Sequence, residues 1–223
     1  MLQPEEFRRK ANRVLRRQWL KYTLRNVTNN VNHAGLERIY TIPDPWSLDS
    51  PREHVRFEAT NRLIKRNFGN LGDVLEIGSG EGLQSSYLRQ ICTNLHGIDV
   101  SPTAVARARR RLPDVHFESG DLFHQDWLKQ RERRFDLVVA CEVLYYIADL
   151  EATLAEMNRL GDACFVSFFT GEAYKLCARM DRIEGVHKDW YHFDGITWLF
   201  AWWKNPPRGA DRIADTATPT AAT

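Results

Sequence analysis

A glycine-rich turn constrains the fold of this chain more than any other feature of its sequence. The seven residues EIGSGEG, at positions 76–82, follow a short apolar stretch and precede apolar residues at helical spacing. A strand, a glycine-rich turn and a helix in this order are typical of nucleotide-cofactor sites in doubly wound α/β proteins. We therefore expect Gly78 to permit the sharp turn, Gly80 to admit a ligand to the backbone, and Gly82 to let the helix lie close to the strand.

The acid that precedes the first glycine indicates which cofactor this turn holds. A lone G-x-G would also fit a dehydrogenase, whose NAD carries a pyrophosphate. The spacing E-x-G-x-G-x-G, with Glu76 at the end of the strand, favours S-adenosylmethionine, because the tail of that cofactor offers an ammonium group to a carboxylate. We predict that the cofactor and its product, S-adenosylhomocysteine, contact Glu76, Gly78, Ser79, Gly80 and Gly82.

The rest of the pattern predicts a sheet built from alternating strands and helices. Strands are predicted at about 73–78, 94–99, 115–119, 135–140 and 163–169, and helices over about 82–91, 101–111 and 149–160. A further helix begins after Ser50-Pro51 and ends before Gly69. The near-continuous apolar run of the fourth strand is typical of a strand buried on both faces. Repeated units of this kind predict a Rossmann-like, doubly wound α/β sheet with right-handed crossovers.

The end of the predicted domain differs from its beginning. Two strand-like runs, 186–193 and 196–203, flank Asp194-Gly195, a dipeptide typical of β-hairpins. These runs raise the expected number of strands to seven, mostly parallel with an antiparallel C-terminal hairpin. Such a hairpin is unusual for a dehydrogenase sheet.

Charge is distributed unevenly along the chain. Residues 1–30 contain eight Lys and Arg against two Glu, whereas the whole chain carries only +2, so the remainder is mildly acidic. We predict a basic helical N-terminal extension over 1–35, a domain that binds S-adenosylmethionine over 36–205, and a disordered tail over 206–223. The extension either covers the substrate side of the domain, which we favour, or binds nucleic acid or an anionic surface.

The sequence has the character of a cytoplasmic protein. No segment reaches the run of about 18 apolar residues that a membrane helix needs. Glu5 and Glu6 come before any hydrophobic run, which argues against a secretory signal. The four cysteines lie far apart, with no C-x-x-C pair and no histidine cluster beside them, so we expect reduced thiols and no metal site. None of these features indicates the oligomeric state.

Three further strands are predicted to end in residues suited to the same cofactor. Asp99 ends the second strand, where a carboxylate can accept from both ribose hydroxyls. Asp121 follows the third strand and can accept from the adenine amino group, while Val100 and Leu122 supply apolar faces for the ring. Cys141 ends the fourth strand as a small packing residue, and backbone carbonyls beyond it can receive the ammonium group. Each aspartate has a simpler alternative role, as a helix cap or a loop residue.

Residues after the fourth strand and in the hairpin are predicted to face the transferable methyl group. Methyl transfer needs a base only where the acceptor must lose a proton. The candidates for this role are Glu142, Tyr145, Tyr146 and His192. The candidates for binding the acceptor are Trp46, Arg56 and Tyr191. Two alternatives stay open, because Glu142 could pair with Arg56 and a lone histidine in a strand is often structural.

Taken together, the residues at the ends of the first four predicted strands resemble those of a class I S-adenosylmethionine-dependent methyltransferase. This resemblance covers about 70–204. A narrower resemblance, over about 40–160, is to the rhizobial nodulation-factor N-methyltransferase family. It is carried by Asp44-Pro45-Trp46, by Glu53 and Arg56, and by the run EVLYY at 142–146. The resemblance implies methylation of the free amine of a de-N-acetylated chitooligosaccharide. It weakens over 170–204, where much of the acceptor pocket would be built, so the identity of the acceptor is not carried over.

The sequence leaves three functions to compare. The preferred one is N-methylation of a small-molecule acceptor, with an amine of a sugar or natural product as the expected group. The second is methylation of RNA held by the basic extension, against which stand the acidic domain and the few aromatic residues of the extension. The third is an NAD-linked oxidoreductase, which the glycine spacing and the closing hairpin disfavour.

Overall fold

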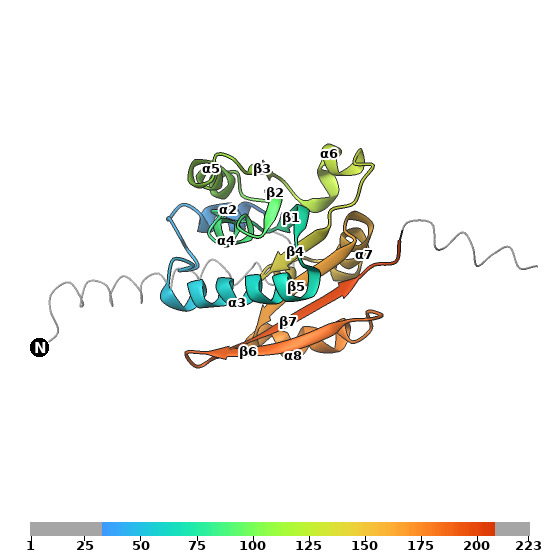
Figure 1. The fold of residues 1–223 in the computed structure, drawn as a ribbon. Helices are drawn as coiled ribbons and strands as arrows, with labels where there is room; N and C mark the ends of the chain where they lie inside the picture. Colours follow the sequence, from blue (N-terminus) through green and yellow to red (C-terminus); the bar gives the residue numbers. More distant parts are fainter. Residues whose placement is uncertain (1–32, 208–223) are drawn as a thin grey trace, which may run out of the picture.

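The described part of the protein is organised around a single sheet. The computed structural model describes residues 33–207. Within this range, seven strands lie in the order β3-β2-β1-β4-β5-β7-β6, which Figure 1 shows from top to bottom. Their bounds are β1 (Leu71–Ile77), β2 (Cys92–Asp99), β3 (His116–Ser119), β4 (Leu137–Cys141), β5 (Ala163–Phe169), β6 (His187–Phe193) and β7 (Ile196–Lys204).

The pairing of the strands confirms the predicted fold class. Strands β1 to β5 pair in parallel, whereas β7 is antiparallel to both β5 and β6. Asp194 and Gly195 form the turn of the β6–β7 hairpin and have positive φ angles of 49° and 71°. The hairpin signal in the sequence therefore marks a real hairpin, inserted with its second strand next to β5.

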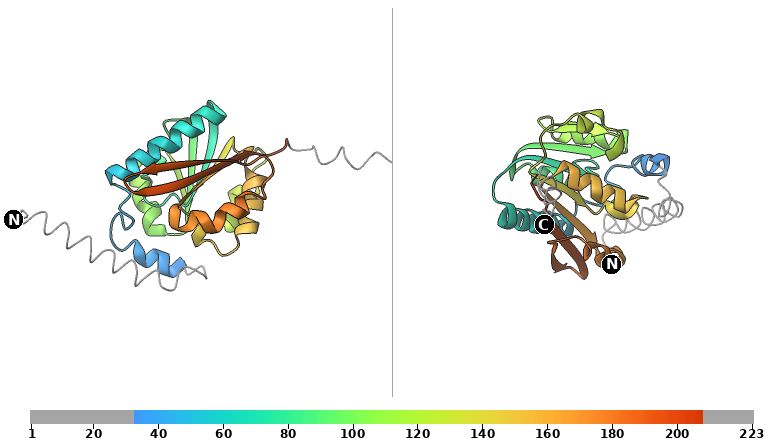
Figure 2. Two further views of the ribbon diagram at one scale, coloured as in Figure 1. Left: turned by 90° about the horizontal axis from the view of Figure 1, so that it is seen from below. Right: turned by 90° about the vertical axis from the view of Figure 1, so that its right-hand side faces the viewer.

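Helices cover both faces of the sheet. Their bounds are α2 (His33–Ile39), α3 (Pro51–Phe68), α4 (Ser85–Leu88), α5 (Pro102–Arg111), α6 (Asp126–Lys129), α7 (Leu150–Leu160) and α8 (Thr170–Met180), with 3₁₀ turns η1 (Leu122–His124) and η2 (Leu144–Tyr146). The right-hand view of Figure 2 shows α3 and α7 on opposite sides of the sheet. One apolar core lies on the side of α3 and α5, and the other lies on the side of α7 and α8.

Strand β4 shows why the central sequence reads as an apolar run. Val138 and Ala140 pack in the core beside α7 and α8, whereas Leu137 and Val139 pack in the core beside α3 and α5. All four side chains are fully buried. Because successive residues of a strand point to opposite faces, a strand covered on both sides needs apolar residues at every position.

The predicted helix boundaries are confirmed where capping residues are present. Helix α3 starts at Pro51 and ends before Gly69, which has a φ of 73°. Ser101 caps α5 by accepting a hydrogen bond from the Ala104 backbone N–H over 3.0 Å. Proline at the first helical position and a side-chain oxygen at the cap are both favourable at a helix start.

Several predicted elements differ in extent from the structure, among them β1 and β4, each of which is displaced by one or two residues. The helix expected over 82–91 is only the single turn α4, because Gly82 has a φ of 78° and cannot lie in a right-handed helix. Strand β2 begins at Cys92 and not near residue 94. Helix α8 was not predicted at all, although it packs Ala173 and Leu176 into the core.

The predicted three-part division of the chain is not tested by this fold. Most of the basic extension over 1–35 lies outside the described residues, and its last three residues open α2. The predicted tail over 206–223 is described only at residues 206 and 207. Among the described residues, no helix is both long enough and apolar enough to cross a membrane.

Candidate cofactor and acceptor site

A cavity of about 660 Å³ opens where the parallel strands end. It is lined by the glycine turn after β1, by the ends of β2 and β4, and by the first residues of β7. Residues 33–49, here called the strap, contribute further lining side chains from α2 and the turns after it. Strand order reverses between β1 and β4, so the cavity lies at the topological switch point where doubly wound sheets bind ligands.

The first glycine of the turn is required by both conformation and space. Gly78 has a φ of 73°, and a Cβ atom there would lie 2.5 Å from Cγ2 of Val143. The backbone N–H groups of Gly78 and Ser79 both donate to the Ile98 carbonyl, over 2.8 and 3.0 Å. The turn is thereby held against the end of β2, as its predicted role requires.

The other two glycines make close contacts of different kinds. A Cβ atom on Gly80 would lie 3.1 Å from the Tyr40 hydroxyl, so the strap approaches the turn at this point. A Cβ atom on Gly82 would lie 3.2 Å from Cβ of Ala108 in α5. Gly82 therefore permits the turn itself, and it also permits close packing of the turn against the neighbouring helix α5.

Glu76 is a buried acid beside the turn. Only 3 % of its surface is exposed, and it accepts a hydrogen bond from the Ser85 hydroxyl. Burial raises the pKa of Glu76 to about 8, and the nearby Asp99 carboxylate adds to the rise. Among the described residues, no basic side chain forms an ion pair with Glu76. A ligand with an ammonium group would supply the missing positive charge.

Asp99 is a second buried acid, at the end of the adjacent strand β2. Its carboxylate accepts from the backbone N–H groups of Gly80, over 2.8 Å, and Ser101, over 2.9 Å. Burial raises the pKa of Asp99 to about 6, although these two hydrogen bonds oppose the rise. The predicted alternative role as helix cap belongs to Ser101, so the Asp99 side chain is free to face the cavity as well as the turn.

The predicted adenine side of the site is also part of the cavity. Val100, Asp121 and Leu122 all line it. Asp121 caps η1 by accepting from the backbone N–H groups of Phe123 and His124, and it also contacts the His124 ring. Burial opposes ionisation of Asp121, but these hydrogen bonds outweigh it and lower its pKa.

Two buried polar atoms in the cavity lack partners. Ser79 Oγ and Gln84 Nε2 are buried, and neither has a hydrogen-bond partner within residues 33–207. Both residues line the cavity. Buried polar groups in proteins are nearly always satisfied, so these two atoms indicate that a polar ligand completes the site. Gln84 was not among the residues predicted from the sequence.

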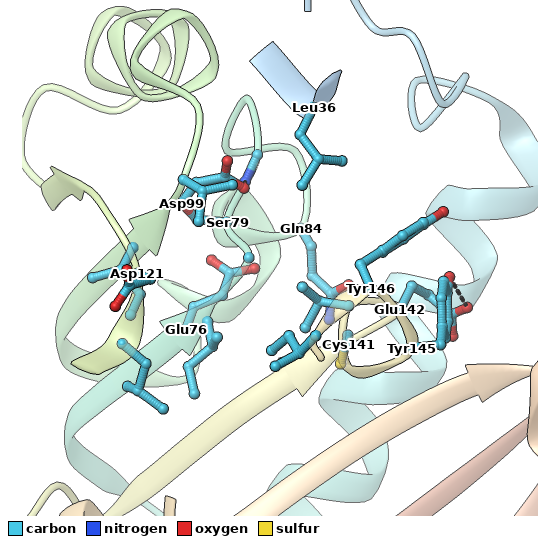
Figure 3. Close-up of a pocket in the computed structure, with 18 of the residues that line it drawn as sticks. Leu36, Glu76, Ser79, Gln84, Asp99, Asp121, Cys141, Glu142, Tyr145 and Tyr146 are labelled. Carbon is cyan, nitrogen blue, oxygen red and sulfur yellow. Dashed lines mark hydrogen bonds between the residues drawn. The ribbon is translucent and has the colours of Figure 1, made fainter. Parts of the chain in front are cut away.

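The end of β4 brings the predicted catalytic residues to the cavity, as Figure 3 shows. Burial raises the pKa of the Cys141 thiol to about 11, so Cys141 is a packing residue and no nucleophile at neutral pH. Glu142 has a φ of 58°, a conformation uncommon for residues other than glycine. Backbone strain of this kind is frequent at functional sites.

The Glu142 carboxylate is held by three donors. It accepts from Ser167 Oγ over 2.8 Å, from the Phe169 backbone N–H over 3.0 Å, and from the Tyr145 hydroxyl over 3.2 Å. Withdrawal from water raises the pKa of Glu142, and the charge of Arg56 opposes the rise. The pKa of Tyr145 is also raised, first by burial and then by Glu142.

Arg56 lies beneath this cluster and is only 2 % exposed. Its guanidinium donates to Glu53 over 2.7 Å and to the Gln84 side-chain oxygen over 2.9 Å. The ion-pair partner of Arg56 is therefore Glu53, while Glu142 is close enough for its charge to act on Arg56. Arg56 lines the cavity from a fixed position.

Aromatic rings form the wall opposite the turn. The rings of Trp46 and Tyr146 lie 5.6 Å apart, and those of Tyr145 and Phe169 lie 5.8 Å apart. The Trp46 indole N–H donates to the Tyr40 hydroxyl over 3.2 Å, which fixes the ring in the strap. Trp46, Tyr145 and Tyr146, predicted for the acceptor side, all line the cavity, and their role there stays a prediction.

Two predicted residues lie on β6, outside the cavity. His192 Nδ1 lies 2.8 Å from the Thr197 hydroxyl, and Tyr191 packs against Trp198 with ring centroids 6.3 Å apart. The hairpin turn does lie at the predicted edge of the sheet, since Phe169 pairs with Trp198. However, the hairpin contributes Ile196 and Trp198 to the cavity, and the sequence analysis had named neither for this role.

Apart from Trp46, the residues of the strap were not predicted as part of the site. Glu37 accepts from the hydroxyls of Ser101 and Thr103 at the start of α5, and Glu81 accepts from the Asp44 backbone N–H over 2.8 Å. These bonds attach the strap directly beside Asp99 and the glycine turn. A possible sequence signal was the apolar pair Leu36 and Tyr40, four residues apart next to a basic segment.

Comparisons with known proteins agree with this geometry. The profile of the family "Nodulation protein S (NodS)" matches residues 28–192. Nodulation protein S from Bradyrhizobium diazoefficiens is 34% identical over 141 residues, which cover 60% of this chain and 64% of that protein. Its counterpart from Sinorhizobium fredii is 30% identical over 141 residues, covering 60% of this chain and 62% of that protein. The matches thus span less than two thirds of either relative.

A solved structure is similar over a larger part of the fold. It is the crystal structure of the N-methyltransferase NodS from Bradyrhizobium japonicum WM9 in complex with S-adenosyl-L-homocysteine. The likeness has a TM-score of 0.63 at 25% sequence identity and covers 80% of this chain and 100% of that chain.

Proposed function

We propose a function from one premise, that this chain belongs to the nodulation protein S family. The protein is an S-adenosylmethionine-dependent methyltransferase, and its acceptor is an amine of a small molecule. The observation that carries this proposal is the pair of buried acids, Glu76 and Asp99, at the ends of adjacent strands beside a glycine turn. Glu76 suits an ammonium group, and Asp99 suits the two hydroxyls of a ribose.

The residues of the cavity fit this cofactor. Glu76 lies among the described residues without a basic partner, so the ammonium group of the amino-acid tail would neutralise it. Asp99 lies at the end of β2 for the ribose hydroxyls, and Val100 and Leu122 flank the place for the base. Ser79 Oγ is a buried donor that awaits an acceptor. NAD carries no ammonium group that could meet Glu76.

Bound S-adenosylmethionine supplies a methyl group on a sulfonium, which is already activated for in-line displacement. The chain's own part is then mainly to orient the acceptor, which can contribute roughly 7–11 kcal/mol toward lowering the barrier. Glu142 lies at the end of β4, where it can orient an amine and accept its proton. Its raised pKa brings the carboxylate closer to the range of an effective base at neutral pH.

The acceptor side supports a sugar-like amine as substrate. Trp46, Tyr146 and Phe169 present aromatic faces, and Glu142 presents a carboxylate that can attract a cationic amine. Aromatic faces and acids together suit a cationic, partly apolar ligand such as an amino sugar. The names of the relatives point the same way, since the solved relative is an N-methyltransferase.

We also place the protein in the cytoplasm and keep the three-part division of the chain as a proposal. All four cysteines are free, in agreement with a reducing compartment. Most of the charged N-terminal extension and of the tail lies outside the described residues, so their roles rest on the sequence.

Calorimetry and a mass-shift screen test this function. The wild-type protein should bind S-adenosylhomocysteine and should show no heat of binding with NADH under the same conditions. Incubation with S-adenosylmethionine and a panel of amino sugars and other amines should add one methyl group to the true acceptor. A protein that binds NADH and not S-adenosylhomocysteine would contradict the proposed function.

A further inference from the structure

Gln84, like Ser79 in the glycine turn, has a buried polar atom in the cavity wall without a hydrogen-bond partner among the described residues. It follows Gly82 by two residues and is only 7 % exposed. It lies close to Cys141 at the end of β4, and Figure 3 shows its side chain directed toward that strand end. A long polar side chain so deeply buried needs partners for both ends of its amide.

Only one end of the amide has a strong hydrogen-bond partner. Arg56 Nη1 donates to Gln84 Oε1 over 2.9 Å. Because a guanidinium can only donate, this bond assigns the oxygen of the amide to the Arg56 side and leaves the NH₂ group facing away. Within residues 33–207, Gln84 Nε2 is buried and has no oxygen or nitrogen acceptor; on this side the amide meets only the Cys141 thiol, a weak acceptor. A donor in this state calls for an acceptor on a ligand.

The position of Gln84 ties it to the acid that faces the cofactor's ammonium group. The next residue, Ser85, donates its hydroxyl to Glu76. Gln84 and Glu76 both line the cavity, and they are linked through Ser85, the residue next to Gln84. An acid and an amide donor on one region match the two charged groups that an amino acid carries on a single carbon.

We propose that Gln84 Nε2 donates to the α-carboxylate of the cofactor's amino-acid tail, while Glu76 holds the ammonium group. This inference rests on the proposed function, because it assigns a part of the same cofactor. Arg56 acts as a positioning residue, since it orients the amide and adds positive charge beneath it. Hydrogen bonds to an ionised acceptor are stronger than bonds to a neutral one, so a carboxylate is the best partner for this donor.

The acids around the site do not compete for the amide donor. Glu53 is paired with Arg56 over 2.7 Å. Glu142 already accepts from Ser167, Phe169 and Tyr145. Each carboxylate is therefore satisfied by other donors, and the Gln84 NH₂ group is left for the ligand.

Calorimetry with two ligands tests the assignment without measuring turnover. The ligands are S-adenosylhomocysteine and S-adenosyl-3-thiopropylamine, which differ only in the α-carboxylate. Gln84→Met keeps the length of the side chain and removes the donor. It should weaken S-adenosylhomocysteine roughly 10- to 150-fold, the range for a hydrogen bond to a charged group. Binding of the carboxylate-free amine should stay within about twofold of wild type.

Two further variants serve as controls. Gln84→Glu keeps an acceptor for Arg56, so it preserves that contact if the methionine variant fails to fold. Like the methionine variant, it should weaken S-adenosylhomocysteine more than the amine that lacks the carboxylate. Gln90→Met changes a nearby glutamine whose amide donates to the Ser86 carbonyl, and it should leave both affinities unchanged. Thermal melts of all variants should establish that each protein is folded.

The outcomes separate this inference from the function on which it rests. Equal losses for both ligands in a folded Gln84 variant, or no loss for either, would overturn the assignment to the carboxylate. Wild-type protein that fails to bind S-adenosylhomocysteine at all would overturn the proposed function, and this inference with it. Selective loss of the ligand with the carboxylate supports both.

Discussion

Tyr145 donates a hydrogen bond from its hydroxyl to Oε2 of Glu142 over 3.2 Å, at the end of β4 that faces the cavity. The bond holds in one cluster two residues that the sequence named separately as candidate catalytic groups. It also leaves Glu142 as the base of the pair, because the pKa of Tyr145 is raised well above its ordinary value and its hydroxyl keeps its proton at neutral pH. The first prediction follows from this arrangement.

Glu142→Gln should lower turnover of the true acceptor on the order of 10²–10⁴-fold, the range for loss of a general base. Activity should recover in part at high pH, where more of the acceptor amine is already deprotonated. Tyr145→Phe removes one of three donors to Glu142 and should have a smaller effect on turnover. Steady-state rates between pH 6 and 10 measure both effects.

Cofactor affinity provides the control for this experiment. Both variants should bind S-adenosylhomocysteine as the wild type does, because Glu142 faces the acceptor. Unchanged turnover of Glu142→Gln near neutral pH would reduce Glu142 to a structural residue. A large loss without recovery at high pH would indicate that the carboxylate binds the acceptor and accepts no proton.

The second prediction concerns proton release on cofactor binding. With a pKa of about 8, Glu76 is mostly protonated at pH 7 in the free protein. An ammonium group beside it favours the ionised form, so binding of S-adenosylhomocysteine at pH 7 should release close to one proton. Calorimetry in two buffers of different ionisation enthalpy measures this number. Glu76→Gln should abolish the release, and proton uptake by the wild type would contradict the prediction.

The third prediction concerns stability without ligand. Glu76 has a pKa of about 8 in the folded protein and an ordinary value near 4.5 when unfolded, so the folded state binds more protons between these values. The free energy of unfolding should therefore fall as pH rises from about 4.5 to 8. Glu76→Gln should raise the melting temperature at pH 8 while weakening S-adenosylhomocysteine. Thermal melts of both proteins at pH 6 and pH 8 test this, and a Gln variant that melts below wild type at pH 8 would refute it.

The fourth prediction separates ligand binding from structure at Asp99. Asp99→Asn keeps an acceptor for the Gly80 backbone N–H but removes the charge. We expect S-adenosylhomocysteine to bind more weakly by roughly 1.5–3 kcal/mol, the scale for a hydrogen bond to a charged group. Ser101→Ala, which removes the cap of α5, should lower the melting temperature with little change in affinity. If the Asn variant loses stability and keeps full affinity, Asp99 serves only the turn.

The fifth prediction tests the packing of the turn. Gly78→Ala should destabilise the protein by roughly 1–3 kcal/mol, because it places a Cβ atom at a positive φ. The same atom would also lie 2.5 Å from Cγ2 of Val143. A second change, Val143→Ala, should remove the clash and recover part of the loss but not the conformational strain. Urea unfolding of the two single variants and the double variant measures the coupling, and strictly additive losses would exclude the contact.

The sequence predicted the parts of this protein that depend on local chemistry. The glycine turn could be predicted because few residues other than glycine tolerate the φ of Gly78. The hairpin could be predicted from Asp194-Gly195. Helix α8 was not predicted because it follows β5 directly and has Phe169 at its N-cap, where no side chain makes a capping hydrogen bond. Gly171 in its first turn also weakens the helical pattern. Nothing in that stretch carries a helix start signal.

Contacts between distant segments were beyond the reach of sequence patterns. The part of Gln84 in the site is visible only from its hydrogen bond with Arg56, which lies 28 positions earlier in the chain. Strand β6 was predicted, yet its register with β7 decides that Tyr191 pairs with Trp198 and His192 with Thr197, outside the cavity. Register and long-range pairing are set by the whole fold, so a strand pattern alone cannot say which side chains reach the site.

The hairpin that closes the sheet has a consequence for how new specificities arise. The turns after β1, β2 and β4 line one half of the cavity, whereas Phe169, Ile196 and Trp198 reach it from the last third of the described chain. The family match ends at residue 192, before Ile196 and Trp198. The hairpin's share of the cavity is thus separable along the gene from the turns after β1, β2 and β4. Exchange of residues 170–204 between relatives is a modular route by which evolution, or a chimeric protein, can alter the acceptor while the methyl donor stays the same.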